Sequence, residues 1–200
     1  MVKLARYESI KKTDHINQRE TEKLSEITEL FSVAFEKSFN TKLIGGADEP
    51  YYRPMSDDQD VCFLYFREDF ISSALHEISH WCIAGEERRG LEDFGYWYNP
   101  AGRSITKQAE FERVEVKPQA LEWMFSVGCN HSFSFSADNF SIDCNASSNT
   151  EFAKAVLAQI QVWCSSGEMP LRGLHFLNIL SKRFDTEPTF IENYHSAKAL

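Results

Sequence analysis

The sequence predicts an α+β fold class that is mainly helical, with a small β-sheet in a single domain. Several long segments carry apolar side chains at the three- and four-residue steps of a helix, whereas only short segments have the composition of strands. The motif H-E-x-x-H at residues 76–80 falls within one of the predicted helices. Helical spacing places its two imidazoles on one face, about one turn apart, where they can bind a single metal ion.

The composition is that of an ordinary globular protein, with 200 residues, 42% hydrophobic and 26% charged. We expect residues 1–17 to form a loose polar extension and residues 18–200 to form one domain. No segment approaches the ~20 apolar residues of a membrane span, and no signal-peptide pattern opens the chain, so we expect a cytoplasmic protein. The five cysteines include no C-x-x-C pair, which argues against a zinc ribbon and a disulfide scaffold. The net charge of −9 argues against a nucleic-acid-binding surface.

The first third of the chain predicts a helix followed by a strand. Residues 20–39 repeat apolar side chains at helical spacing, which predicts an amphipathic helix. Residues 41–54, interrupted by Gly45 and Gly46, are expected to form a loop with a short strand. The apolar run at residues 61–66 has the composition of a buried strand.

The helix that carries the H-E-x-x-H motif is predicted at residues 69–85. Asp69 stands where an N-cap belongs, and Gly85 stands where a left-handed residue after the last turn belongs. His76 and His80 lie beside the stripe that faces the core, so we expect both to be half buried. That stripe consists of Ile71, Ala74, Leu75, Ile78 and Trp81.

The remainder of the chain predicts three more helices. Residues 86–103 are rich in charged and aromatic side chains and are expected to form a loop. A helix is expected at residues 106–127 despite Pro118, and the alternating residues 131–136 suggest a strand. Two closing helices are expected at residues 151–164 and 171–184.

A metal ion bound by two histidines needs at least one more ligand. Zinc sites of this kind take a third protein ligand, and non-haem iron is held by two histidines and one carboxylate with open positions. Glu112, Glu115 and Glu122 follow at steps of three and seven, so they share one face of the helix expected at 106–127. Any of the three carboxylates can be the third ligand, and spacing alone does not choose among them.

Glu77, inside the motif, is the candidate catalytic residue. In H-E-x-x-H peptidases the glutamate activates a metal-bound water as a general base. Alternatively, its carboxylate orients a ligand or the bound water. A zinc metallopeptidase is therefore one function that the motif predicts, and a structural metal site is another.

Longer blocks of sequence carry a resemblance to a known family. The block HEISHWCIAG at residues 76–85 looks like the signature of the bacterial elongation factor P hydroxylases, and so do DFGYWY at 93–98 and VEVKPQAL at 114–121. The resemblance spans roughly residues 20–184 and is strongest from 71 to 125. Shorter matches are Phe39 to Ile44, Asp48 to Pro50, Arg88, Arg89, Pro100, Gly102 and Arg103.

The resemblance implies a metal-dependent protein hydroxylase. Family members hydroxylate the β-lysylated lysine of translation elongation factor P, the final step of its modification. The expected metal is Fe(II) with dioxygen as co-substrate, and the fold is not the double-stranded β-helix of 2-oxoglutarate enzymes. His76 and His80 match the family's metal-binding histidines, and Glu115 lies within the VEVKPQAL block, so Glu115 is preferred as third ligand over Glu122.

The substrate that the resemblance implies has a long cationic side chain. Carboxylates and aromatic faces are suitable partners for an ammonium group. Both kinds of side chain follow the metal-binding helix, so we expect substrate contacts from Glu92, Asp93, Tyr96, Trp97 and Tyr98. No feature of the sequence identifies 2-oxoglutarate as a co-substrate.

Overall fold

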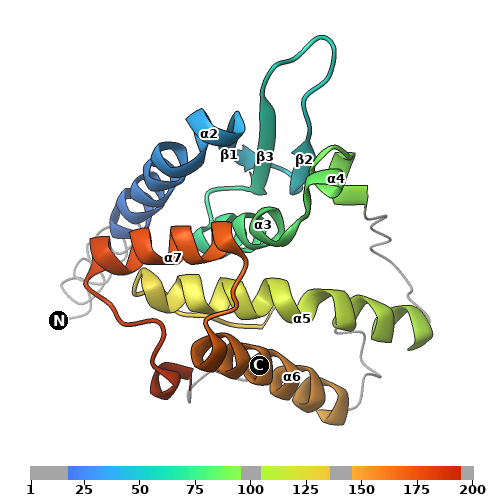
Figure 1. Ribbon diagram of the computed structural model, residues 1–200, viewed down its shortest axis with the longest axis vertical. Helices are drawn as coiled ribbons and strands as arrows, with labels where there is room; N and C mark the ends of the chain where they lie inside the picture. The colour runs from blue at the N-terminus through green and yellow to red at the C-terminus, as the bar shows by residue number, and fades with distance from the viewer. Residues whose placement is uncertain (1–17, 96–104, 136–145, 195–200) are drawn as a thin grey trace, which may run out of the picture.

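A small sheet, with helices packed against one of its faces, forms the framework of the protein (Figure 1). The computed structural model describes residues 18–95, 105–135 and 146–194, and the side chains of all of these except 105–109 and 146–149. The predicted extension at residues 1–17 lies outside the described residues. The architecture is mainly helical with a small sheet, which confirms the predicted fold class and differs from a double-stranded β-helix.

The sheet has the order β1-β3-β2, with β3 (Cys62–Arg67) in the centre. Strand β1 (Thr41–Ala47) pairs with β3 in parallel, and β2 (Tyr51–Arg53) pairs with it in antiparallel fashion. Alternate side chains of β3 are buried, as expected for a strand with one face on the core. The strand expected at 61–66 is therefore confirmed.

The segment expected to be mostly loop contributes two strands instead. Gly45 stands where a Cβ would come within 2.6 Å of the ring of Phe66, so this position requires a glycine. Gly46 has a φ of +78° and lies where the register between β1 and β3 shifts. The two glycines therefore let β1 continue past Phe66, although in the sequence they resemble the end of a strand.

The N-terminal helix covers residues 18–31 and continues through a π-helical turn, η1 (Ser32–Glu36), into α2 (Lys37–Phe39). It ends at Asn40, which has a left-handed φ of 48°. The predicted amphipathic helix at 20–39 is thus confirmed, with a π turn that its periodicity did not indicate. Its buried face consists of Leu24, Ile27, Phe31 and Phe35.

Helix α3 (Ile71–Ile83) carries the H-E-x-x-H motif, and its predicted apolar stripe is fully buried. The predicted end residues were wrong. Phe70, rather than Asp69, occupies the N-cap position, and Gly85 has a φ of −64°, outside the left-handed region. The C-terminal carbonyls of α3 are instead bound by Arg172, whose Nη2 lies 2.9 Å from the oxygen of Trp81, 3.1 Å from that of Cys82 and 2.5 Å from that of Ala84.

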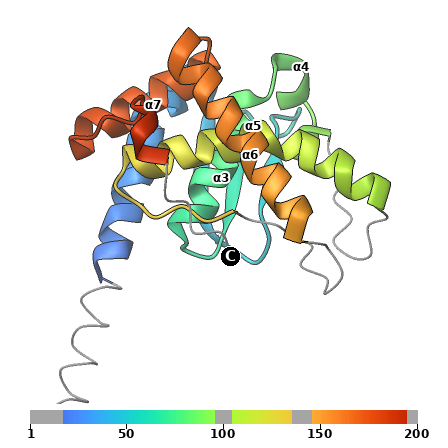
Figure 2. The same ribbon diagram turned by 90° about the horizontal axis from the view of Figure 1, so that it is seen from below.

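Helix α5 (Ile105–Gly128) is central to the helical layer and packs against α3, α6 (Ala146–Ser166) and α7 (Leu171–Phe184). Figure 1 shows α5 between α7 and α6, and Figure 2 shows α6 passing across it. The three helices expected in this part of the chain are confirmed, and α5 continues past Pro118.

Residues 131–135 contain no strand, so that part of the prediction at 131–136 was wrong. Their alternating aromatic residues pack on α5 instead, because Phe133 stacks on the ring of Trp123 at 4.9 Å and Phe135 meets its edge at 5.5 Å. Residue 136 lies outside the described residues.

The segment after α3 was expected to be a loop. Its described part forms two short helices, α4 (Glu86–Arg89) and the 3-10 helix η2 (Glu92–Gly95). Another 3-10 helix, η3 (Ile191–Tyr194), closes the described chain. None of the described helices combines the length and apolar character needed to cross a membrane.

Candidate metal centre

The packing of α3 against α5 brings His76, His80 and Glu115 together, each offering one donor atom within 4.8 Å of the others. The Nε2 atoms of the two imidazoles lie 3.1 Å apart. Glu115 places Oε1 at 3.3 Å from Nε2 of His80 and Oε2 at 3.7 Å from Nε2 of His76. Donor atoms bound about 2.1 Å from one metal ion lie roughly 3–3.5 Å apart, so the spacing suits a shared ion.

The chemistry of the donors also fits a metal ion. Oε2 of Glu115 is buried and has no hydrogen-bond partner, which is costly for a carboxylate oxygen unless a cation compensates it. Two imidazoles with one carboxylate suit zinc, iron, copper or nickel far better than calcium or magnesium. The histidine side chains keep 22% and 15% of their surface exposed, so solvent or a substrate can approach the group.

The charges of the site keep Glu115 ionised. Burial alone would raise the pKa of this carboxyl, but the nearby His80 and His76 outweigh burial and lower the pKa to about 2. A hydrogen bond from Gln119, one turn further along α5, acts in the same direction on this pKa. Glu115 is therefore an anionic donor throughout the physiological pH range.

His76 has a carboxylate on each side. Its Nε2 faces His80 and Glu115, while its Nδ1 lies 2.8 Å from Oε2 of Glu122. Burial lowers the pKa of His76, but the charge of Glu122 outweighs burial and, with Glu115, raises the pKa to about 10 in the metal-free protein. A metal ion must therefore displace a proton from His76 when it binds.

Of the three carboxylates considered as third ligand, only Glu115 joins the two histidines in this group. Glu122 is even more buried than Glu115, but it contacts the opposite nitrogen of His76. Glu112 is partly buried and lies outside the group. The geometry therefore favours Glu115.

Glu77 lies at the same site, partly exposed beside the donor group. Burial raises the pKa of its carboxyl, while the electrostatic interactions with His76 and His80 act in the opposite direction. Asp93 is close enough for its charge to raise the pKa of Glu77 further. Its predicted catalytic role stays a prediction.

The candidate substrate contacts are only partly described. Tyr96, Trp97 and Tyr98 lie outside the described residues. Glu92 is exposed, whereas Asp93 is half buried and accepts a 2.7 Å hydrogen bond from the backbone N–H of Tyr52. No pattern in the sequence indicates this structural contact.

Arg172 is the residue near this site that sequence reasoning missed. It binds the last turn of α3, immediately after His80, although 91 residues separate it from Trp81. Its guanidinium also lies 4.7 Å from the ring of Trp81. A single arginine in an amphipathic helix carries no local signal of such a contact.

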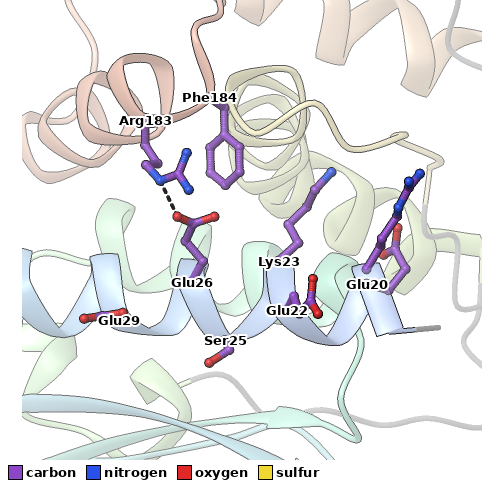
Figure 3. Close-up of a pocket in the computed structure, with 9 residues that line it drawn as sticks. Glu20, Glu22, Lys23, Ser25, Glu26, Glu29, Arg183 and Phe184 are labelled. Carbon is purple, nitrogen blue, oxygen red and sulfur yellow. Dashed lines mark ion pairs between the residues drawn. The ribbon is translucent and has the colours of Figure 1, made fainter. Parts of the chain in front are cut away.

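A pocket of about 670 Å³ lies elsewhere, along the N-terminal helix beside the end of α7 (Figure 3). Its opposite charges are partly paired, since Arg183 binds Glu26 across it. None of its lining residues belongs to α3 or α5, so it is separate from the candidate metal centre. The lining consists of Arg19, Glu20, Glu22, Lys23, Ser25, Glu26, Glu29, Arg183 and Phe184.

The site has the features of a metalloenzyme and places the protein in that class as a candidate. It combines two histidines one helical turn apart, a carboxylate from a second helix and a side that is open to solvent. A sequence model of the family described as elongation factor P hydroxylase matches residues 30–194. A curated relative from Haemophilus influenzae, named elongation factor P lysine hydroxylase, is 44% identical over 165 residues, which cover 82% of this chain and 91% of the relative. The chain belongs to the elongation factor P hydroxylase family.

The family match confirms the resemblance found in the sequence and covers α3 and α5 completely. It favours the hydroxylase prediction over the zinc metallopeptidase that the H-E-x-x-H motif alone suggested.

Proposed function

We propose that this protein is an oxidoreductase, a non-haem iron monooxygenase that hydroxylates the β-lysylated lysine of translation elongation factor P. The observation that carries the proposal is the group formed by His76, His80 and Glu115 in a chain of this family. A relative 44% identical to this chain is named for lysine hydroxylation of elongation factor P. Because such a substrate works on the ribosome, we expect the protein to act in the cytoplasm.

The proposed metal is Fe(II), with His76, His80 and Glu115 as its ligands. Hydroxylation of an aliphatic C–H bond needs activated dioxygen, which Fe(II) bound by three such ligands can supply at its open positions and redox-inert zinc cannot. The reaction would consume dioxygen, two electrons from an external reductant and two protons from solvent, so that one oxygen atom would enter the lysine side chain and the other would leave as water.

The roles of the remaining residues follow from charge. The charge of Asp93 contributes to raising the pKa of Glu77, which follows His76 in the motif. We propose that these carboxylates and Glu92 attract the cationic lysyl-lysine, while Tyr96, Trp97 and Tyr98 pack against its aliphatic part or its ammonium group. Glu77, whose carboxyl has a raised pKa, is proposed to hold or transfer a proton at the metal centre.

Intact-mass spectrometry of β-lysylated elongation factor P tests this proposal. The substrate is incubated in air with reductant and protein loaded anaerobically with Fe(II), and the zinc-loaded protein serves as the first control. We expect a gain of one oxygen atom with iron only, and no gain with His76→Ala. Substrate that lacks the β-lysyl group is the second control. No gain with any metal or reductant would contradict the proposed function.

A further inference from the structure

We infer that Glu122 is a positioning residue for the metal centre, which fixes the imidazole of His76 through its Nδ1 and leaves Nε2 free to bind the ion. This inference rests on the metal ligation proposed above and adds a residue that acts through a ligand rather than as one.

The geometry around His76 separates the functions of its two nitrogens. Nε2 faces the other donors, at 3.1 Å from Nε2 of His80 and 3.7 Å from Oε2 of Glu115. Nδ1 lies 2.8 Å from Oε2 of Glu122 and donates its proton there, because a carboxylate can only accept. A nitrogen that carries this proton has no lone pair left for a metal ion, so the metal-binding atom must be Nε2.

Burial makes this arrangement specific. Only 3% of Glu122 is exposed, and a buried carboxylate requires a strong donor. Glu115 and Glu122 lie seven residues apart on α5, about two helical turns, so the same helix reaches His76 from both sides. One helix thus supplies the proposed ligand and the carboxylate that orients a neighbouring ligand.

The expected consequence is a change in metal affinity without a change in the ligand set. Carboxylates that accept the second N–H of a metal-bound histidine fix its tautomer and make it a better donor, and their loss typically weakens metal binding ~10- to 100-fold. Glu122→Gln keeps the size of the side chain but removes its charge. Its amide can also donate to Nδ1, which favours the wrong tautomer of His76.

Titration with Co(II) tests this directly, because its visible spectrum reports the number and kind of ligands. For Glu122→Gln we expect the spectrum of the wild-type protein at saturation, with a dissociation constant ~10- to 100-fold higher. Glu115→Gln should instead alter the saturated spectrum, since a proposed ligand is changed. Glu110 is an exposed carboxylate on the same helix, so Glu110→Gln is the matched control. It should leave both the saturated spectrum and the dissociation constant unchanged.

A second measurement is independent of affinity and of catalysis. In zinc-loaded protein with ¹⁵N-labelled histidine, we expect the Nδ1 proton of His76 to resonate far downfield and to exchange slowly with water. Glu122→Gln should move this signal upfield and speed up the exchange, whereas Glu122→Asp should restore much of the wild-type behaviour.

The inference is overturned if Glu122→Gln binds Co(II) as tightly as the control, if its Nδ1 proton is unchanged, or if its saturated spectrum shows a lost ligand. If Glu122→Gln fails to fold, Glu122→Asp carries the same test, with an intermediate dissociation constant and a retained Nδ1 signal expected. Failure of hydroxylation alone would contradict the proposed function and leave these two metal-binding measurements valid.

Discussion

The contacts of Arg172 with the end of α3 predict how strongly replacement of this arginine should destabilise the protein. Arg172 Nη2 donates to carbonyls in the last turn of α3, at 2.9 Å from Trp81 and 2.5 Å from Ala84, and its guanidinium lies over the Trp81 ring. Replacing it by methionine keeps an apolar stem but removes every donor. The C-terminal carbonyls of the metal-binding helix then lose their charged partner.

The magnitude follows from the separate contributions. A hydrogen bond from a charged donor is worth about 1.5–3 kcal/mol, and a cation at a helix C-terminus about 0.3–1 kcal/mol. The cation–π contact adds about 0.5–1 kcal/mol. Two effects reduce this sum. Arg89 also donates to the Ala84 carbonyl, so this carbonyl keeps one partner when Arg172 is replaced. Burial, followed by repulsion from Arg89, disfavours the charge of Arg172 and lowers its pKa. We therefore expect Arg172→Met to lower the free energy of unfolding by about 2–3 kcal/mol in all.

Urea unfolding of the metal-free protein, followed by tryptophan fluorescence, measures this difference. The matched control is Arg183→Met, at another arginine of α7. It removes an exposed ion pair with Glu26 and should lower the free energy of unfolding by at most about 1 kcal/mol. Arg172→Met should also weaken metal binding, because His80 lies in the turn that loses its partner. If Arg172→Met is no more destabilising than Arg183→Met, the contacts of Arg172 do not stabilise the end of α3.

Two further predictions concern pH and backbone packing. In metal-free protein the pKa of His76 is raised, so the attraction of His76 to Glu122 stabilises the fold fully below pH 6.5 and this stabilisation is lost as the pH rises through about 10. Urea unfolding in the presence of a chelator should show the decline in the free energy of unfolding. Glu122→Gln should flatten this pH dependence. Gly45→Ala should destabilise the protein by about 1–3 kcal/mol, because the new Cβ meets the Phe66 ring at 2.6 Å. Gly85→Ala, in open space at an ordinary φ, should be nearly neutral in the same assay, and an equal loss in both variants would contradict this explanation.

The sequence predicted those features that depend on local periodicity. The long helices follow from apolar residues at helical spacing, and the His76–His80 pair follows from the geometry of a single helix. The burial of Ile78 and Trp81 beside that pair could be predicted for the same reason, and the structure bears it out.

Features that depend on how two elements meet could not be predicted from local spacing, and the preference for Glu115 came from the family resemblance alone. Glu112, Glu115 and Glu122 share one face of α5, and only the packing of α3 on α5 decides which of them reaches both histidines. The end of α3 was misplaced for the same reason, because its partner Arg172 comes from a distant helix. Strand β2 exists because β3 offers it an edge for pairing, which its three residues do not signal by themselves.

The candidate centre takes its histidines from one helix and its carboxylate from another, and this has a mechanical consequence. An ion bound to His80 and Glu115 would fasten both ends of residues 81–114, much as a disulfide closes a loop. That stretch contains Glu92, Asp93 and the aromatic residues proposed to receive the lysine. Loading with metal would therefore hold α3 and α5 together at the two ends of that stretch, so the bound ion should also stabilise the packing of these helices against each other.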